Sequence, residues 1–195
     1  MTANGKPKFA MYWAASCGGC EIAVLNIFEK ILDVDANFEV VFWPVAMDAK
    51  YKDVEAMPDQ SILLTLFIGA SRNDEHAYLA QLVRQKSQIL VAFGSCANEG
   101  CMPALANLTT VKEIVNTVYQ TVSTDNPQGI RPQPNYTVPE GELHIPALYP
   151  IVRTLDQVVK VDYYMPGCPP ESHQIAAVID LVICTEKLRC RPPVL

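Results

Sequence analysis

Residues 62–68 read Ile-Leu-Leu-Thr-Leu-Phe-Ile, and this almost entirely apolar stretch ends at Gly69. Because such a strand has no polar face to turn toward water, it is typical of a parallel sheet that is covered on both sides. Residues 88–93 (QILVAF) form a second apolar stretch that stops at Gly94. Between the two lie residues 73–86, an expected amphipathic helix whose apolar side consists of Tyr78, Leu79, Leu82 and Val83.

The same alternation continues toward the N-terminus. Residues 8–13 (KFAMYW) and 38–43 (FEVVFW) predict two further strands. Between them, from residue 20 to residue 32, helical spacing relates the apolar residues Ile22, Leu25, Ile27, Phe28, Ile31 and Leu32, which are expected to form the inward face of a helix. Strands that alternate with helices in this way predict an α/β fold with a doubly wound parallel sheet and right-handed crossovers.

The C-terminal half is less regular. Residues 110–120 predict a helix, and residues 121–150 are rich in Pro, Asn, Gln, Thr and Gly, which indicates an irregular excursion. Residues 158–163 (VVKVDY) then predict another strand, and residues 169–187 predict the last helix. We expect residues 1–195 to form a single domain, with the excursion serving function or facing a partner.

Composition narrows the classes of function. The chain has 195 residues, of which 50% are hydrophobic and 18% charged, with a net charge of −6. This composition supports a packed core and offers no basic surface for nucleic acid. Without an apolar run long enough to span a membrane, or a signal peptide, we expect a cytoplasmic protein with no membrane span.

The cysteines provide the strongest functional signal. Seven cysteines are present, an odd number that does not suit a disulfide framework in a reducing compartment. Cys17 and Cys20 directly follow the first predicted strand, Cys96 follows the strand at residues 88–93, and Cys168 follows the last strand. Since the carboxyl ends of parallel strands share one edge of the sheet, these four thiols are expected to converge there.

Four convergent thiolates are the usual protein ligands of a [4Fe-4S] cluster. Gly18 and Gly19 permit the tight turn between the first two cysteines, and Gly94 and Gly167 let the backbone approach the cluster. Three alternatives remain open at this point. The cysteines are ordinary core residues, they hold structural zinc, or Cys17 and Cys20 form the active site of a thioredoxin-like thiol–disulfide oxidoreductase.

Three cysteine motifs together carry a family resemblance. W-A-A-S-C-G-G-C-E (13–21), F-G-S-C-A-N-E-G (93–100) and M-P-G-C-P-P (165–170) resemble the small, electron-transfer subunit of nickel–iron hydrogenases. Residues 41–57 resemble most closely the methyl-viologen-reducing, or F420-non-reducing, type. The 20 kDa subunit of respiratory complex I is similar too, but typically has adjacent cysteines in its first motif, whereas Gly18 and Gly19 separate Cys17 from Cys20 here.

The resemblance implies a flavodoxin-like fold and one [4Fe-4S] cluster held by Cys17, Cys20, Cys96 and Cys168. It also implies a large hydrogenase subunit that carries the nickel–iron centre, and a further acceptor subunit of the heterodisulfide-reductase or diaphorase type. The chain would relay electrons between them, so it would be an oxidoreductase only within the complex. A complex-I-like quinone oxidoreductase subunit is the alternative from the same fold.

Small subunits of the methyl-viologen-reducing type usually continue into a cysteine-rich segment with more clusters. We therefore expect either a one-cluster version or a shortened chain. Of the other cysteines, Cys101 is either a spare thiol near the cluster or a buried structural residue, Cys184 is expected in the core, and Cys190 is assigned no role. Glu21, directly after the Cys17–Cys20 motif, is either a carboxylate favoured by the first turn of a helix or a residue of a proton path or a subunit interface.

Overall fold

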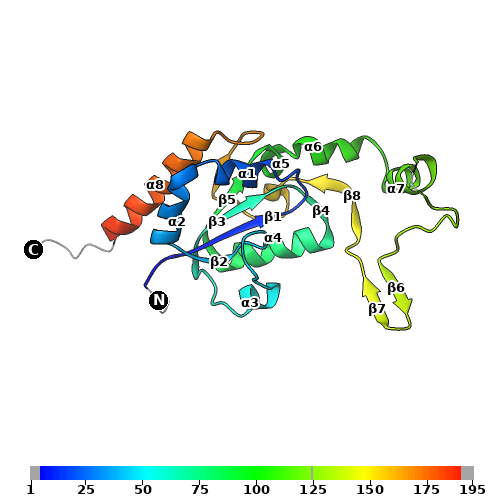
Figure 1. The fold of residues 1–195 in the computed structure, drawn as a ribbon, viewed down its shortest axis with the longest axis horizontal. Helices are drawn as coiled ribbons and strands as arrows, with labels where there is room; N and C mark the ends of the chain where they lie inside the picture. The colour runs from blue at the N-terminus through cyan, green and yellow to red at the C-terminus, as the bar shows by residue number, and fades with distance from the viewer. Residues whose placement is uncertain (1–4, 124, 190–195) are drawn as a thin grey trace, which may run out of the picture.

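A five-stranded parallel sheet forms the centre of the molecule (Figure 1). The computed structural model describes residues 5–123 and 125–189. The strands follow the order β2 (Glu39–Phe42), β1 (Lys8–Trp13), β3 (Ile62–Ile68), β5 (Ser87–Phe93) and β9 (Tyr163–Met165). Numbered along the chain within this sheet, the order is 2-1-3-4-5, which is the flavodoxin-like arrangement. The predicted fold class is confirmed.

Helices cover both faces of the sheet (Figure 1). One layer consists of α1 (Gly19–Leu25), α2 (Ile31–Asn37) and α8 (Ser172–Arg189), and the other contains α3 (Tyr51–Glu55) and α4 (Asp74–Lys86). Alternate residues of β1 pack against the two helical layers. Met11 belongs to the core cluster of the first layer and Tyr12 to that of the second. Every residue of β3 is buried, as its apolar sequence predicts.

The expected helix at residues 20–32 is wrong in its extent and in its inward face. The segment divides into α1, a short 3-10 turn at Phe28–Lys30, and α2. Ala23, Val24 and Ile27 pack into the core, whereas four larger apolar side chains remain exposed. Their exposed fractions are 59% for Ile22, 57% for Leu25, 70% for Phe28 and 66% for Leu32. Tyr78 on α4 is likewise exposed, contrary to expectation, while Leu79, Leu82 and Val83 are buried.

The last strand also differs from its prediction at residues 158–163. Only Tyr163–Met165 pairs with β5, after a 3-10 turn at Leu155–Gln157. Asp162 explains where pairing begins, because its backbone N–H donates to the Leu90 carbonyl and its carboxylate accepts from the Leu90 N–H. Arg84 of α4 donates to the same carboxylate. Burial raises the pKa of Asp162, but these donors outweigh it and leave that pKa below its ordinary value.

We expect Asp162→Asn to lower the free energy of unfolding by about 1–2 kcal/mol at neutral pH, because a partly buried ionic contact is lost. Since the folded-state pKa is depressed, the stabilisation is fully present above the ordinary carboxyl pKa and disappears as the pH falls through the lower folded value. Urea unfolding at several pH values measures this. Asp48→Asn, which removes the exposed pair with Lys50, should leave the free energy of unfolding nearly unchanged, because solvent screens exposed ion pairs. An equal effect of both substitutions would contradict the prediction.

The segment between β5 and β9 contains more regular structure than the sequence predicts. It begins with α5 (Ser95–Glu99), α6 (Cys101–Ala104), a 3-10 turn at Leu105–Leu108 and α7 (Val111–Asn116). The helix expected at residues 110–120 is present as α7, which continues into a π-helical turn at Thr117–Thr121. Within the predicted irregular excursion, β6 (Asn135–Val138) and β7 (Gly141–His144) form a hairpin that projects from the central sheet (Figure 1). β8 (Leu148–Arg153) pairs with β4 (Ser71–Asn73).

Among the described residues, no helix has the length and apolar character needed to cross a membrane.

Candidate metal centre

Three loops at the carboxyl ends of β1, β5 and β9 meet at one edge of the sheet. Backbone hydrogen bonds connect the second and third loops, from the Gly94 N–H to the Met165 carbonyl at 2.8 Å and from the Ser95 N–H to the Gly167 carbonyl at 2.8 Å. Cys96 follows directly on α5, and Cys168 follows Gly167. The convergence predicted for these loops is therefore present in the fold.

Gly94 is the point where all three loops touch. A Cβ atom placed on Gly94 would lie 2.4 Å from the Cys20 Sγ and 3.5 Å from the Gly167 carbonyl oxygen. Its backbone angles, φ 83° and ψ 161°, belong to a region that only glycine adopts readily. The sulfur of Cys20 thus occupies space that any other residue at position 94 would need.

The four predicted ligand thiols influence one another electrostatically. Burial raises the pKa of Cys20 to about 12, with further contributions from Cys96, Cys17 and Cys168. Burial also raises the pKa of Cys96 to about 11, and the neighbouring thiols of Cys101, Cys168 and Cys17 add to the effect. Cys20 and Cys96 are buried, while Cys17 and Cys168 are exposed, so the group forms a shallow rim with an inner and an outer pair. The structure brings all four predicted ligands into one neighbourhood.

This donor set fits an iron–sulfur cluster. It offers four thiols, all free of disulfide bonds, on loops whose backbone leaves room for the sulfur of Cys20. Among residues 5–123 and 125–189, no group of three or more His, Cys, Asp or Glu residues is arranged to hold a metal ion. In a four-iron cube each thiolate binds its own iron atom, so the four sulfurs need not converge on one point.

Glu21 is buried beside this rim. Its carboxylate accepts a hydrogen bond from the Trp43 indole N–H at 3.0 Å, which connects α1 to the chain just beyond β2. Burial raises the pKa of Glu21, and the indole donor opposes that rise. The contact gives Glu21 a structural partner, and its membership of a proton path stays a prediction.

The remaining cysteines agree only in part with expectation. Cys101 is half-buried rather than a core residue, and a hydrogen bond with its thiol is the main reason that the pKa of Cys168 is raised. Cys184 is exposed on α8, contrary to the expected core position, and so is Leu181 one turn before it. Cys190 lies outside the described residues. Of the two expectations for Cys101, a thiol near the predicted ligands therefore agrees better with the structure than a core residue.

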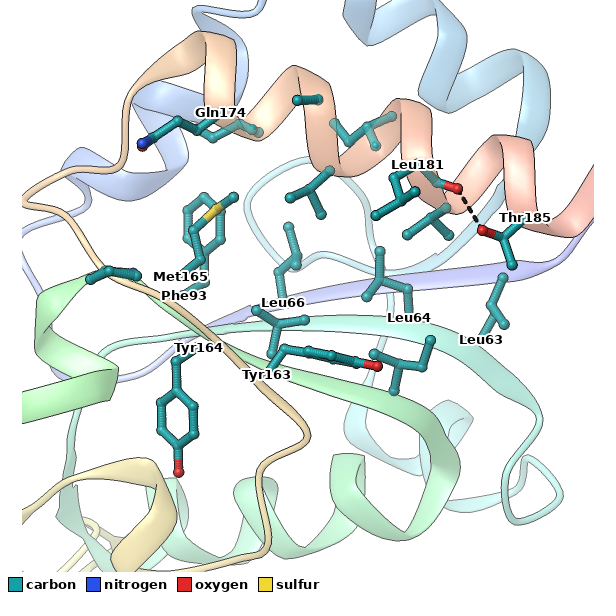
Figure 2. A pocket seen from close by; sticks show the side chains of 18 residues that line it. Leu63, Leu64, Leu66, Phe93, Tyr163, Tyr164, Met165, Gln174, Leu181 and Thr185 are labelled. Atoms are coloured by element: carbon teal, nitrogen blue, oxygen red, sulfur yellow. Dashed lines mark hydrogen bonds between the residues drawn. The ribbon is translucent and has the colours of Figure 1, made fainter.

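A cavity lies apart from the thiols. It is an apolar groove of about 690 Å³ between α8 and the β5–β9 side of the sheet (Figure 2). Leu64, Leu66 and Phe93 line its floor, and Leu181 and Tyr163 stand along it. No cysteine lines the groove, so it does not belong to the candidate metal centre.

Sequence comparison places the chain in a known family. A family model described as NADH ubiquinone oxidoreductase, 20 Kd subunit, matches residues 17–182, which include all four predicted ligands. The chain belongs to this family. A relative from Archaeoglobus profundus, named as the iron-sulfur subunit of an F420-non-reducing hydrogenase, is 44% identical over 90% of this chain. A relative from Methanocaldococcus jannaschii, named as a vhu subunit of an F420-non-reducing hydrogenase, is 37% identical over 88% of this chain.

The structural comparison agrees with these relatives. A chain in the crystal structure of an NAD+-reducing nickel–iron hydrogenase in the H2-reduced state superposes with a TM-score of 0.79 at 26% identity, covering 97% of this chain and 95% of that one. The matches cover 56% and 54% of the lengths of the Archaeoglobus and Methanocaldococcus relatives, so the chain spans about half of each. Together the comparisons confirm the resemblance to hydrogenase small subunits within the 20 Kd subunit family.

Proposed function

We propose that the chain is the electron-transfer small subunit of a cytoplasmic nickel–iron hydrogenase, relaying electrons through one [4Fe-4S] cluster. The observation that carries the proposal is the meeting of Cys17, Cys20, Cys96 and Cys168 at one sheet edge, in a chain whose relatives are named as hydrogenase subunits. When bound, the cluster supplies a one-electron carrier. A quinone oxidoreductase subunit shares the fold, but hydrogenase relatives favour the first function.

The chain's own residues hold the cluster and limit its contact with water. Cys20 and Cys96 bind from the buried side, and Cys17 and Cys168 bind from the exposed side. Gly94 leaves space for the Cys20 sulfur, and its close approach keeps bulk solvent from that side. The exposed pair needs a cover, because solvent exposure alters the potential of a cluster and admits oxidants.

A partner subunit supplies that cover in our proposal. Exposed apolar side chains lie on the segments that directly follow two of the cysteines. Ile22, Leu25, Phe28 and Leu32 lie on the helices that follow Cys20, and Met102, Leu105 and Leu108 lie on the helix and turn that follow Cys101. Apolar patches of this kind mark interaction sites. We assign this surface to the large hydrogenase subunit, which would hold the nickel–iron centre.

The double substitution Ile22→Ser/Leu25→Ser tests this surface. We expect it to weaken association with the large subunit by about 3 kcal/mol, roughly 100-fold in affinity, because two apolar side chains no longer become buried. The thermal midpoint of the isolated chain should change little, since both side chains are already exposed. Tyr78→Ser, an exposed position on α4 in the opposite helical layer, serves as the control in a pull-down with tagged large subunit. Equal retention of the large subunit by both variants would refute the assignment.

Anaerobic purification of the native complex tests the proposed function as a whole. We expect a large subunit to co-purify, iron and acid-labile sulfide in equal amounts in this chain, and hydrogen-dependent reduction of a viologen dye. Quinone reduction without hydrogen-dependent dye reduction would support the complex-I-like alternative instead. A cluster-free chain that only cycles between dithiol and disulfide would support the thioredoxin-like alternative.

The same preparation identifies the acceptor side. We propose an acceptor subunit of the heterodisulfide-reductase or the diaphorase type. Hydrogen-dependent reduction of NAD+ by the complex identifies a diaphorase, and reduction of a heterodisulfide identifies the other type. The proteins that co-purify with the chain provide an independent check.

A further inference from the structure

Both tryptophans of the chain contact the segment that carries the first two predicted ligands. Trp13 ends β1 and Trp43 directly follows the neighbouring strand β2, and the sequence contains no other tryptophan. The ring of Trp13 lies against Gly18, inside the Cys17–Cys20 motif. The indole N–H of Trp43 donates to Glu21, the first residue after that motif. Two neighbouring strand ends therefore each place an aromatic side chain on the same ligand segment.

Trp13 supports the centre of the motif. A Cβ atom placed on Gly18 would lie 3.3 Å from the indole Cη2 and Cζ2 atoms, which leaves little room for any side chain there. Gly18 has φ 83° and ψ −6°, in the left-handed region that glycine adopts readily. Its N–H also donates to the Ser16 hydroxyl oxygen at 3.3 Å. The indole and the Gly18 backbone pack together, so the ring limits where the chain can run between Cys17 and Cys20.

Trp43 holds the residue that follows the motif. Its side chain is buried, and its indole nitrogen lies 3.0 Å from the Oε1 atom of Glu21. Glu21 is buried as well, and because a buried carboxylate without a donor is costly, this bond favours one orientation of the first turn of α1. Cys20 belongs to the same turn, and its sulfur lies close against Gly94. A rotation of that turn would therefore displace the Cys20 sulfur.

The chain that leads into the motif is fixed by backbone contacts. Ala15 forms a bridge with Ala70, just beyond β3, through hydrogen bonds of 3.1 Å and 2.9 Å. A Cβ atom on Gly69 would lie only 2.8 Å from the Ala15 carbonyl oxygen, so the two loops pack tightly. These contacts end before Cys17, which is itself exposed. The bridge positions the entrance of the motif and leaves its centre and its exit to the two tryptophans.

We propose that Trp13 and Trp43 are positioning residues that keep the Cys17–Cys20 motif in the arrangement that binds the cluster. Neither ligates iron; Trp13 acts through Gly18 and Trp43 acts through Glu21. Ligands that are held in place lose less conformational freedom on binding, so they bind more tightly. Replacement of residues that orient metal ligands typically costs roughly 10–100-fold in affinity or activity. The inference rests on the proposed function, since it requires the cluster, and it adds the residues that hold the first two ligands.

The rate at which the anaerobically purified complex loses iron to a strong chelator measures this role. We expect Trp13→Ala to release iron roughly 10-fold faster than the unmodified complex, or more. Trp13→Phe, which keeps an aromatic ring beside Gly18, should restore most of the difference. Tyr136→Ala removes an exposed aromatic side chain from β6, and as the matched control it should release iron at the unmodified rate. Circular dichroism under the same conditions shows whether each variant keeps its fold.

A second pair of variants isolates the hydrogen bond of Trp43. Trp43→Phe keeps a ring at this position but leaves the Glu21 carboxylate without its donor, so part of its effect comes from an unpaired buried group. The double substitution Glu21→Met/Trp43→Phe removes both polar partners and avoids that cost. We expect both variants to release iron faster than the unmodified complex while their helical signal is unchanged, because α1 loses the contact that orients its first turn.

Each other outcome overturns the inference. Iron release from Trp13→Ala at the unmodified rate, or equally fast release from Trp13→Phe and Trp13→Ala, excludes support by the ring. Release from the double variant at the unmodified rate excludes support through the hydrogen bond. Faster release from Tyr136→Ala as well, or release that accompanies loss of the helical signal, makes the effect one of general stability. An unmodified complex without a cluster would overturn the proposed function itself, whereas a loaded complex with unaffected variants would overturn only the role of the tryptophans.

Discussion

Cys96→Ala is expected to yield a chain without an intact [4Fe-4S] cluster and to reduce hydrogen-dependent dye reduction by more than about 100-fold, beyond the range seen for residues that only support a metal ligand. The physical reason is the position of Cys96 on the buried side of the rim, in a loop that is hydrogen-bonded to the loop of Cys168. Its loss leaves one iron without a protein ligand at the side where the chain itself encloses the cluster.

Iron and sulfide analysis, visible absorbance and dye reduction by the purified complex measure the effect. Cys184→Ala is the matched control, because Cys184 is an exposed cysteine on α8 outside the three converging loops. It should keep full iron content and full dye reduction. A Cys96→Ala complex with unchanged iron and activity would refute the assignment of Cys96, whereas equal losses in both variants would indicate a general sensitivity to cysteine replacement.

The sequence predicts the sheet well because its strands are buried on both faces. All residues of the strand at 62–68 are buried. Because a strand that is apolar on both faces belongs inside a sheet covered by helices on both sides, its composition predicts this central position. The convergence of the ligand loops follows from the same fact, since parallel strands end at one edge. Both inferences need only local patterns and the topology of a parallel sheet.

The inward face of the first helical segment could not be predicted in this way. Ile22, Leu25, Phe28 and Leu32 are larger and more apolar than residues such as Ala23 that pack in the core, so hydrophobic periodicity selects the wrong side. Small residues allow α1 to pack closely on the sheet, and the larger ones remain for a partner in our proposal. Apolar residues that recur at helical spacing look the same in a single sequence whether they pack in the core or bind a partner.

For Cys101, the sequence did not decide between a core position and a place near the cluster. Gly100 and Cys101 both have positive φ, and spacing along the chain does not encode this local reversal. The strand at residues 158–163 was misplaced because Asp162 uses its carboxylate to occupy the Leu90 N–H. In both cases a side chain or turn replaced the regular pattern that the prediction assumed.

Gly94→Ala is the second substitution with a large expected effect. The added Cβ meets the Cys20 sulfur at 2.4 Å, and the backbone angles of φ 83° and ψ 161° are strained for alanine. Strain of this kind costs about 1–3 kcal/mol per residue. Relief requires movement of Cys20 or of the Gly94 loop, and each movement separates ligands that must bind one cluster. We therefore expect both lower stability and loss of the cluster.

Gly141→Ala separates these two effects. Gly141 also has positive φ, at 144°, but a Cβ there has nothing within 4 Å. This variant should show the backbone strain, by a lower urea midpoint, and keep its full iron content. If Gly94→Ala binds as much iron as Gly141→Ala at equal stability, the space at Gly94 is not needed by a ligand sulfur. If only Gly94→Ala loses iron, close packing of the Cys20 sulfur against the glycine backbone is a requirement of the site, independent of backbone strain.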